Sequence, residues 1–499
     1  MNAKIFSRNY LELYILIITI VVGLILRDLP YLNYKFLYGV DSLGHFWFSK
    51  MILDTGTLLP NNIDISYNGN TGWFTGYAPY FSFHIVESVT ATVTGIQLRF
   101  LFLNLASFIS LFTIIPIYLY LKDDVKNRYQ KYSIVILSAL WFYFIFYSFI
   151  GSYESLGFFL FMLVMYLTKK SKLSKSEKFI SFLTLSILPI THGISSFATF
   201  LYLIAYFLVT NRRVIAIYAM YMCFIIFLVG NIMDRIDIPY IGLYFLKYKL
   251  LLVIPVIFTL MLIRSHISVN KINSNIDKII KNIRKIFITP LFGMIIIIEV
   301  YILFFAIISE YRYLLTSVHY AFGSNLIIEY ILFTFPIGVI LVNQFFHKLC
   351  EFKEQIFYII FLCFGFFASA IKDSEWHFMI IRTIEFISPF LILFIASYVT
   401  NNKKLSILII VSLLAIVPII PSYFYSDQID RPYYPIPQDN IYIVDTITTK
   451  LDCTTDDYVL KTLINIYNPT YDSNYICNVS GVKNKIIIYH YNNIIYTSG

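Results

Sequence analysis

The most informative stretch of the sequence, residues 39–56, reads Gly-Val-Asp41-Ser-Leu-Gly-His45-Phe-Trp-Phe-Ser-Lys50-Met-Ile-Leu-Asp54-Thr-Gly56. It places an acid, an imidazole and a lysine in a short amphipathic run directly after a hydrophobic segment. In a helix, Asp41, His45 and Phe48 lie on one side, so the acid and the imidazole face one site while the aromatic rings lie in a membrane interface. The alternative is an interfacial anchor in which Asp41 only caps the helix.

The composition is that of a polytopic membrane protein. Of 499 residues, 58% are hydrophobic and 13% are charged, and the mean hydropathy is +0.72. These values lie far on the apolar side of a soluble domain. The formal net charge is +9, but the basic residues form short clusters between apolar runs, where they act as topology signals and exclude a nucleic-acid partner. No small-residue cleavage site follows residues 11–27, which predicts a retained span.

Thirteen apolar segments are long enough to cross a bilayer, which takes roughly 20 helical residues. They lie near 11–27, 97–121, 132–150, 153–168, 178–190, 194–210, 213–230, 241–263, 286–308, 326–346, 355–371, 378–399 and 405–421. Residues 80–95 carry an acid, a histidine and several hydroxyls and are interpreted as an interfacial helix. The sequence predicts an all-α polytopic membrane domain over residues 1–421, with two juxtamembrane helices in the outer loop 28–96.

Charge fixes the predicted orientation in the cell membrane. If residues 80–95 do not cross, alternation places the basic clusters on one side, and these include 122–131, 169–178, 212–213, 264–285 and 403–404. The positive-inside bias makes that side cytoplasmic, together with the N-terminus. The tail 422–499 is then extracytoplasmic. Its prolines and short β-rich runs predict a small α/β domain, in which Cys453 and Cys477 suit one disulfide in an oxidising compartment.

Uncommon polar residues gather at the outer ends of the predicted spans. Beside those of the first loop they are Glu154, His192, Arg312, His377, Arg382 and Glu385. In the simpler interpretation an outer histidine is only solvated. Arg382 and Glu385 stand three residues apart about one turn inside the bilayer, where a charged pair marks a substrate path or fixes helix packing.

Two further features leave alternatives open. Tyr77-Ala-Pro79-Tyr80 supplies a proline at a helix start and aromatic rings at headgroup depth, or forms the wall of a lipid pocket. Glu299, inside a predicted span, is a packing group or a cavity-lining acid. The sequence has no Walker loop, no dinucleotide fingerprint and no His-Glu-x-x-His motif.

In layout and short motifs the chain resembles the GT-C superfamily of polytopic glycosyltransferases, including aminoarabinose transferases and oligosaccharyltransferase catalytic subunits. The matching features are Asp41-Ser-Leu-Gly-His45 after the first span, Tyr77-Ala-Pro79-Tyr80 before a second juxtamembrane helix, Glu154 at an outer helix end, the turn Thr191-His192-Gly193, and Arg382 followed by Pro389. The first 200 residues carry most of the resemblance. It implies a polyprenyl-phosphate-sugar donor, a lipid, glycan or protein acceptor, and contact with membrane lipids.

The resemblance also implies roles for individual residues. Asp41 would be the general base on the acceptor hydroxyl, and Glu154 would orient the acceptor or bind a metal. Arg382, helped by Lys50 or His192, would neutralise the departing phosphate. The remaining candidates for substrate binding are His45, Tyr77, Tyr80, Arg312, His377 and Glu385.

The chain departs from the family pattern in two places. The Trp-Trp-Asp-Tyr-Gly motif of oligosaccharyltransferases is absent, so recognition of a peptide sequon is not implied. Asp41 has no second acid beside it, so although Asp41 and Glu154 are the candidate ligands for Mg²⁺ or Mn²⁺, activity is predicted not to need a divalent cation. The alternatives to an enzyme are a transporter or flippase of lipid-linked glycans and a non-catalytic assembly subunit, but no internal repeat pairs the two halves.

Overall fold

The computed structural model describes residues 14, 17–28, 40–57, 80–141, 144–145, 153–210, 212–235, 352–370, 378–416, 484–488 and 494–498. Its helices are α2 (Val40–Thr55), α4 (Phe81–Thr94), α5 (Leu98–Phe112), α6 (Ile114–Leu121), α7 (Arg128–Leu140), α9 (Tyr153–Lys169), α10 (Lys175–Thr191), α11 (Gly193–Thr210), α12 (Arg213–Arg235), α18 (Lys353–Ala370), α19 (Phe378–Tyr398) and α20 (Asn402–Ile416). Strands β1 (Asn484–Ile488) and β2 (Ile494–Ser498) pair antiparallel.

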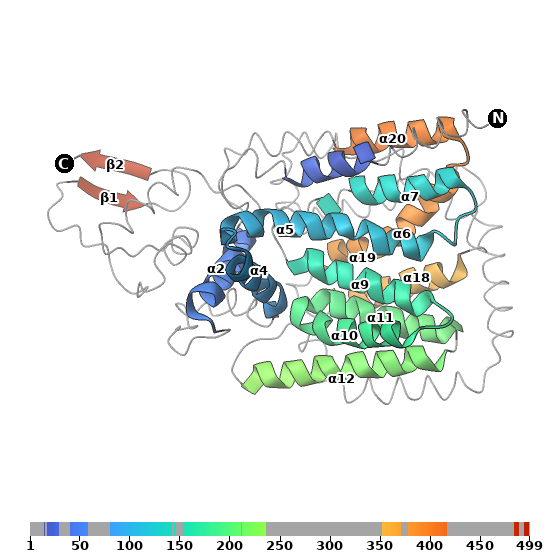
Figure 1. Ribbon diagram of the computed structural model, residues 1–499, viewed down its shortest axis with the longest axis horizontal. Coiled ribbons are helices and arrows are strands. Elements are labelled where there is room, and N and C mark those ends of the chain that lie inside the picture. Colours follow the sequence, from blue (N-terminus) through green and yellow to red (C-terminus); the bar gives the residue numbers. More distant parts are fainter. Residues whose placement is uncertain are drawn as a thin grey trace.

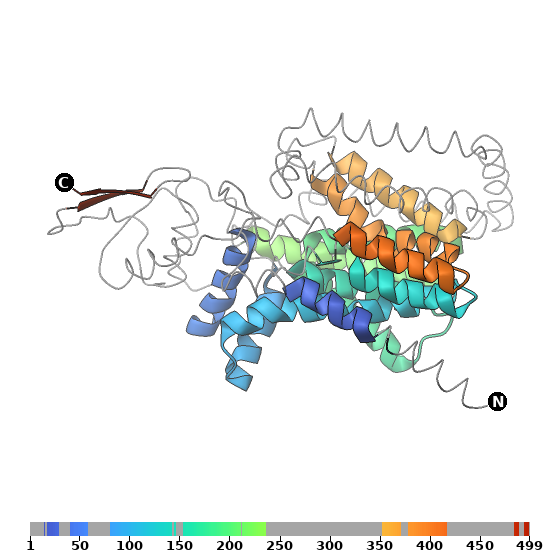
Figure 2. The same ribbon diagram turned by 90° about the horizontal axis from the view of Figure 1, so that it is seen from above.

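The long apolar helices lie side by side in one bundle, and α2 and α4 pack on each other at one end of it (Figures 1 and 2). Helices α9, α10, α11, α18 and α19 form its centre, where apolar side chains from all of them are buried. Among the described residues, three helical stretches are long and apolar enough to cross a membrane, namely Leu98–Leu121, Gly193–Thr210 and Arg213–Ile232. These stretches agree with the predicted spans 97–121, 194–210 and 213–230.

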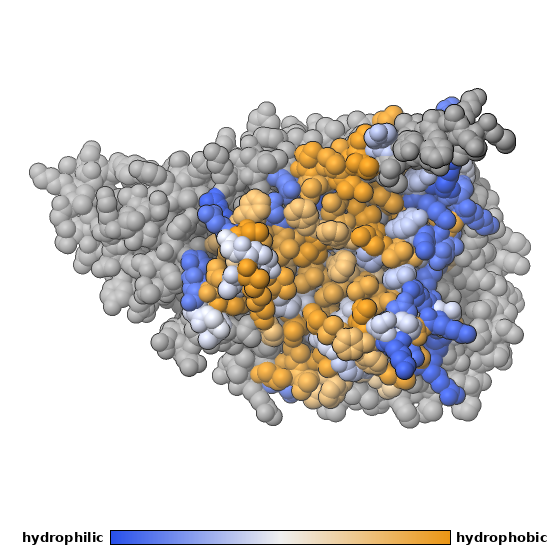
Figure 3. All heavy atoms as spheres, in the orientation of Figure 1, coloured by the Kyte–Doolittle hydropathy of each residue, from blue (hydrophilic) through white to orange (hydrophobic). Residues whose placement is uncertain are grey.

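The two ends of the bundle differ in charge. Figure 3 shows a hydrophobic surface over the middle of the helices and a hydrophilic surface at the end away from α2 and α4. The basic turns between α6 and α7, α9 and α10, α11 and α12, and α19 and α20 all lie at that second end. We call it the basic end. The alternation predicted from charge therefore holds for every described turn.

Arg212 and Lys169 join neighbouring helices at the basic end. Arg212, before α12, donates from Nη1 to the carbonyl of Thr168 at 2.7 Å and from Nη2 to that of Lys170, so it caps the C-terminus of α9. Lys169 binds the carboxylate of Asp124 at 2.6 Å, which joins α9 to the turn after α6.

The span predicted near 132–150 is interrupted, because α7 ends at Leu140, and the described residues 144–145 are again helical. The buried guanidinium of Arg27 donates from Nη1 to the carbonyl of Ala139 at 2.7 Å, in the last turn of α7. Ser110 accepts a hydrogen bond from Arg27 Nε at 3.1 Å and donates to the carbonyl of Phe144 at 2.8 Å. These polar side chains satisfy backbone carbonyls that the interrupted helix leaves without an internal partner.

Of the other predicted spans, some match described helices and some lie outside the described residues. Helices α9, α10, α18, α19 and α20 match the segments predicted near 153–168, 178–190, 355–371, 378–399 and 405–421. The segments 241–263, 286–308 and 326–346 lie outside the described residues, and so does nearly all of the tail, whose described part is the β1–β2 hairpin. The count of thirteen spans and the separate C-terminal domain stay predictions.

Candidate active site at the α2–α4 end

Helix α4 buries three polar side chains on its inward face, together with Phe83 and Ala91, and exposes three valines on its outer face. His84, Glu87, Ser88 and Ala91 are buried, whereas Val89 is 52% exposed and Val93 is 78% exposed. This is the reverse of a helix on a soluble protein, and it suits a helix that lies in a membrane interface over a polar site. The helix predicted over residues 80–95 is confirmed as α4, while its position at a membrane interface stays a prediction.

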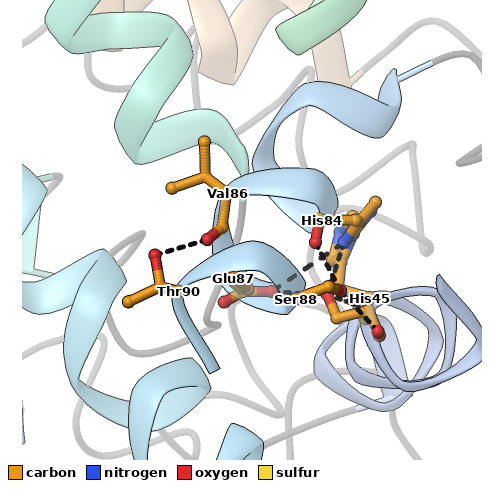
Figure 4. Close-up of polar contacts among 7 residues, drawn as sticks. His45, His84, Val86, Glu87, Ser88 and Thr90 are labelled. Atoms are coloured by element: carbon orange, nitrogen blue, oxygen red, sulfur yellow. Dashed lines mark hydrogen bonds and ion pairs between the residues drawn. The ribbon is translucent and has the colours of Figure 1, made fainter. Parts of the chain in front are cut away.

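Four side chains form a continuous hydrogen-bonded chain between α2 and α4 (Figure 4). His45 Nδ1 lies 3.3 Å from His84 Nε2, and His84 Nδ1 lies 2.9 Å from the hydroxyl of Ser49. That hydroxyl lies 2.5 Å from Oε2 of Glu87. All four side chains are at most 1% exposed. Buried polar groups linked in this way hold each other in defined orientations.

Burial keeps this chain neutral. Desolvation lowers the pKa of His84 to about 3. Desolvation also lowers the pKa of His45 well below its usual range, and the imidazoles of His84 and His192 add to that effect. Desolvation raises the pKa of Glu87 well above its usual range, although the Ser49 hydroxyl opposes the shift. Burial therefore favours the uncharged form of both imidazoles and of the Glu87 carboxyl group.

Aromatic rings connect this chain to α9 and to the turn between α10 and α11. The ring centroid of His45 lies 4.4 Å from that of Tyr153. The ring of Tyr153 also stacks on Tyr80, with centroids 5.2 Å apart, and packs edge-to-face with His192, with centroids 5.0 Å apart. His192 Nε2 lies 3.9 Å from a carboxylate oxygen of Glu154, and its Nδ1 lies 2.6 Å from the hydroxyl of Ser195. Three buried histidines thus belong to one polar cluster, which corrects the interpretation that outer histidines are only solvated.

Two glycines allow these groups to come close. A Cβ atom on Gly193 would stand 2.5 Å from the hydroxyl of Tyr80, and a Cβ atom on Gly157 would stand 2.5 Å from the Cβ of His192. Neither position has room for a side chain, so the absence of one lets α9, α11 and Tyr80 approach around His192.

The backbone places Asp41 and Arg382 at this same end. Asp41 lies in the first turn of α2, one turn before His45. In α19, Phe386 contacts Phe158 of α9, with ring centroids 5.8 Å apart, whereas the Ser397 carbonyl accepts a bond from Gln130 near the basic end. Helix α19 therefore starts at the α2–α4 end, and Arg382 lies one turn before Phe386. The side chains of Asp41 and Arg382 are outside the described part.

The remaining predicted site residues divide into two groups. Glu385 is buried in α19 at 2% exposure, and Lys50 is bound to Asp54 at 2.6 Å, one turn further along α2. The others lie outside the described residues, and they are Tyr77, Arg312, His377, Glu299, Cys453 and Cys477.

Solved structures with a similar fold include those of an archaeal oligosaccharyltransferase. AglB from Archaeoglobus fulgidus, in complex with an inhibitory peptide and a dolichol-phosphate, has a TM-score of 0.50 and 14% sequence identity, over 91% of this chain and 60% of that chain. The apo form of the Archaeoglobus fulgidus enzyme has a TM-score of 0.52 and 13% identity, over 88% and 58%. The chain shares its fold with this oligosaccharyltransferase, as the resemblance to the GT-C superfamily predicted.

A third structure, the Archaeoglobus fulgidus oligosaccharyltransferase in complex with Zn and sulfate, has a TM-score of 0.49 and 14% identity, over 89% of this chain and 56% of that chain. The chain thus spans between 56% and 60% of the length of these three structures. No protein-family model and no curated protein sequence matches the chain.

The described residues of this GT-C fold do not form a metal centre. No group of three His, Cys, Asp or Glu side chains with metal-binding geometry occurs among them. Glu154, a predicted ligand, has the imidazole of His192 at 3.9 Å, and His192 is in turn bound to Ser195.

Sequence reasoning missed Ser49, His84 and Glu87 as site residues. It used the histidine and the acid only to reject a membrane span over residues 80–95. The signal was the spacing, because His84, Glu87, Ser88 and Ala91 recur at three- and four-residue intervals while valines occupy the opposite face. A polar stripe on an otherwise apolar helix indicates that polar side chains face the protein interior.

Proposed function

We propose that the chain is a membrane glycosyltransferase that transfers a sugar from a polyprenyl-phosphate-linked donor to an acceptor at the membrane face occupied by α2 and α4. The observation that carries this proposal is the gathering of acids, imidazoles and the Arg382 position at one end of a GT-C fold, beneath a helix whose outer face is apolar. The dolichol-phosphate bound by the AglB structure is consistent with a donor of this class.

The proposed reaction is an inverting displacement. Asp41 removes the proton of the acceptor hydroxyl while its oxygen attacks the anomeric carbon, and the lipid phosphate departs with the electron pair of the broken bond. Arg382 neutralises the phosphate, and Glu154 with His192 orients the acceptor. A phosphate is a good leaving group, so positioning and charge stabilisation supply most of the catalysis.

Replacement of Asp41 by asparagine tests the proposal. We expect Asp41→Asn to lower the transfer rate by about 10² to 10⁴, the usual contribution of a general base. The assay follows release of polyprenyl phosphate from synthetic dolichyl- and undecaprenyl-phosphate hexoses in membranes that contain the full chain. Asp54→Asn is the matched control, because Asp54 is in the same helix, is partly exposed and pairs with Lys50.

The outcomes separate the candidate functions. Unimpaired transfer by Asp41→Asn would remove Asp41 as the base. The transporter alternative predicts a different result. In that case the wild-type chain releases no polyprenyl phosphate from any donor, but it moves fluorescent lipid-linked sugars across proteoliposome membranes.

A further inference from the structure

The hydrogen-bonded chain between α2 and α4 uses groups that the proposed mechanism leaves idle. We propose that Glu87, Ser49, His84 and His45 form a proton relay, with Glu87 as the proton reserve and His45 Nε2 as the end that delivers the proton to an anionic oxygen of the ligand. The relay rests on the proposed function only for the identity of that ligand, which is the departing lipid phosphate. The relay itself is a property of the four side chains.

The direction of the hydrogen bonds follows from which group begins the chain. When Glu87 carries the proton on Oε2, it donates to Ser49 Oγ across the 2.5 Å contact. Ser49 then donates to His84 Nδ1 at 2.9 Å, which leaves the second proton of that ring on Nε2. His84 Nε2 donates to His45 Nδ1 at 3.3 Å, so His45 carries its own proton on Nε2. One protonated carboxyl group therefore sets the tautomers of both rings.

When Glu87 is ionised, donor and acceptor exchange roles in every hydrogen bond of the chain. Ser49 then donates to the carboxylate, His84 donates from Nδ1 to Ser49, and His45 donates from Nδ1 to His84, so His45 Nε2 has no proton. The two arrangements differ by one proton. In the step that connects them, His45 Nε2 gives its proton to the ligand oxygen and Nδ1 takes the proton of His84 Nε2. His84 Nδ1 takes that of Ser49, and Ser49 takes that of Glu87.

The geometry favours a relay of neutral groups over a single charged histidine. His45 and His84 are 1% and 0% exposed, and an imidazolium in either position would lose its hydration. The nearest Glu87 oxygen is 4.0 Å from His84 Nδ1, with the Ser49 hydroxyl bound to both. Concerted transfer leaves no charge on either ring, and only Glu87 becomes ionised.

In the proposed reaction the relay completes the exchange of protons. The bond between the anomeric carbon and the phosphate oxygen breaks, and that oxygen takes the proton from His45 Nε2. The proton of the acceptor hydroxyl goes to Asp41, one turn before His45 on α2. Proton exchange with water after product release restores both carboxyl groups. General acid assistance of this kind contributes about 10² or more to a rate.

Glu87→Gln separates a relay from a structural bond. The amide of Gln donates to Ser49 as the protonated acid does, so both tautomers and the folded state persist, but an amide cannot give up its proton. We expect about a 10²-fold loss of sugar transfer from dolichyl-phosphate hexose, with a melting temperature no lower than that of the wild type. Ser88→Ala is the matched control, because Ser88 is buried on the same helix and donates only to the backbone carbonyls of Ser49 and His84.

Nitrogen NMR of histidine-labelled protein in lipid nanodiscs tests the relay without any substrate. At pH 7 we expect His45 and His84, assigned with His45→Gln and His84→Gln, to be neutral with the proton on Nε2 in the wild type, Glu87→Gln and Ser88→Ala. Ser49→Ala should abolish the tautomer preference of His84. A charged ring, or a proton on Nδ1 of either ring, would overturn the relay whether or not the chain is a glycosyltransferase.

The sugar-transfer assay then tests whether His45 delivers its proton to the departing lipid phosphate. If the tautomers are as expected and the wild type transfers sugar, full activity of Glu87→Gln overturns His45 as the delivering end. If the wild type transfers no sugar, the proposed function fails, while the tautomers still decide whether the relay exists.

Discussion

His84 is completely buried in a helix whose outward face is valine, and this placement predicts how stability depends on pH. Its pKa falls from 6.5 to about 3 on burial, so between these values the unfolded chain binds a proton that the folded chain does not. The contribution of His84 is therefore present above pH 6.5 and is lost as the pH falls toward 3. The loss is about 1.4 kcal/mol per pH unit in that window.

Glu87 has the opposite effect on the pH dependence of stability. Its pKa is raised on folding, so its contribution is present below about pH 4.5 and is lost as the pH rises. The measurement is the melting temperature of the protein in detergent from pH 4 to 8. We expect His84→Gln to flatten the fall in melting temperature below pH 6.5, and Glu87→Gln to remove the loss of stability that begins as the pH rises above about 4.5. If the melting temperature falls equally steeply below pH 6.5 in His84→Gln and in the wild type, His84 is not buried as a neutral ring.

At the scale of elements, Gly157 sets how closely α9 approaches the turn that carries His192. A methyl group at this position meets the Cβ of His192 at 2.5 Å and the hydroxyl of Ser195 at 2.8 Å, and the Cβ of His192 cannot move without its backbone. We expect Gly157→Ala to lower the free energy of unfolding by about 1 to 3 kcal/mol, as overpacking does. It should also move His192 away from Tyr153 and Glu154.

Ser155→Ala, two residues earlier on α9, is the control for this change. The hydroxyl of Ser155 is buried and has no hydrogen-bond partner among the described residues, so its removal should leave stability unchanged or raise it slightly. The measurement is thermal unfolding in detergent, followed by intrinsic fluorescence. Equal stability of the two variants would mean that the helices can separate at Gly157 without loss.

The same elements show what the sequence could and could not predict. Apolar length and basic turns located α9 to α12 within a few residues, because membrane helices must be about 20 residues long and charges must stay outside. The interruption after Leu140 was missed, because it depends on Arg27 and Ser110, which reach the end of α7 from distant parts of the chain. The break between α5 and α6 at Thr113 has a local cause, since Pro116 cannot donate to the carbonyl of Phe112.

The candidate site divides in the same way. Sequence reasoning placed Asp41, His45, Glu154 and His192 at one end of the molecule, because alternation of spans fixes the end at which each loop emerges. It did not predict the hydrogen bond between His45 and His84, because that contact depends on how α2 packs on α4. Pairing between two short helices depends on three-dimensional contacts that a single sequence does not encode by spacing.

For the whole molecule, the separation of charge between the two ends predicts its orientation in the cell membrane. Every described basic turn lies at one end and the α2–α4 site lies at the other, so the positive-inside bias places the site outside the cytoplasm. Single cysteines at Thr57, after α2, and at Ser171, between α9 and α10, report the two ends. Both positions are exposed, and the five native cysteines are replaced in the background.

We expect a membrane-impermeant maleimide to label Thr57→Cys in intact cells and Ser171→Cys only after the cells are made permeable. In detergent both cysteines should react, which controls for local burial. The reverse pattern would place α2, α4 and the acids around them in the cytoplasm. Because a polyprenyl phosphate keeps its headgroup at one membrane surface, that result would require the donor to be presented from the cytoplasmic side, and the orientation assigned to the chain would be wrong.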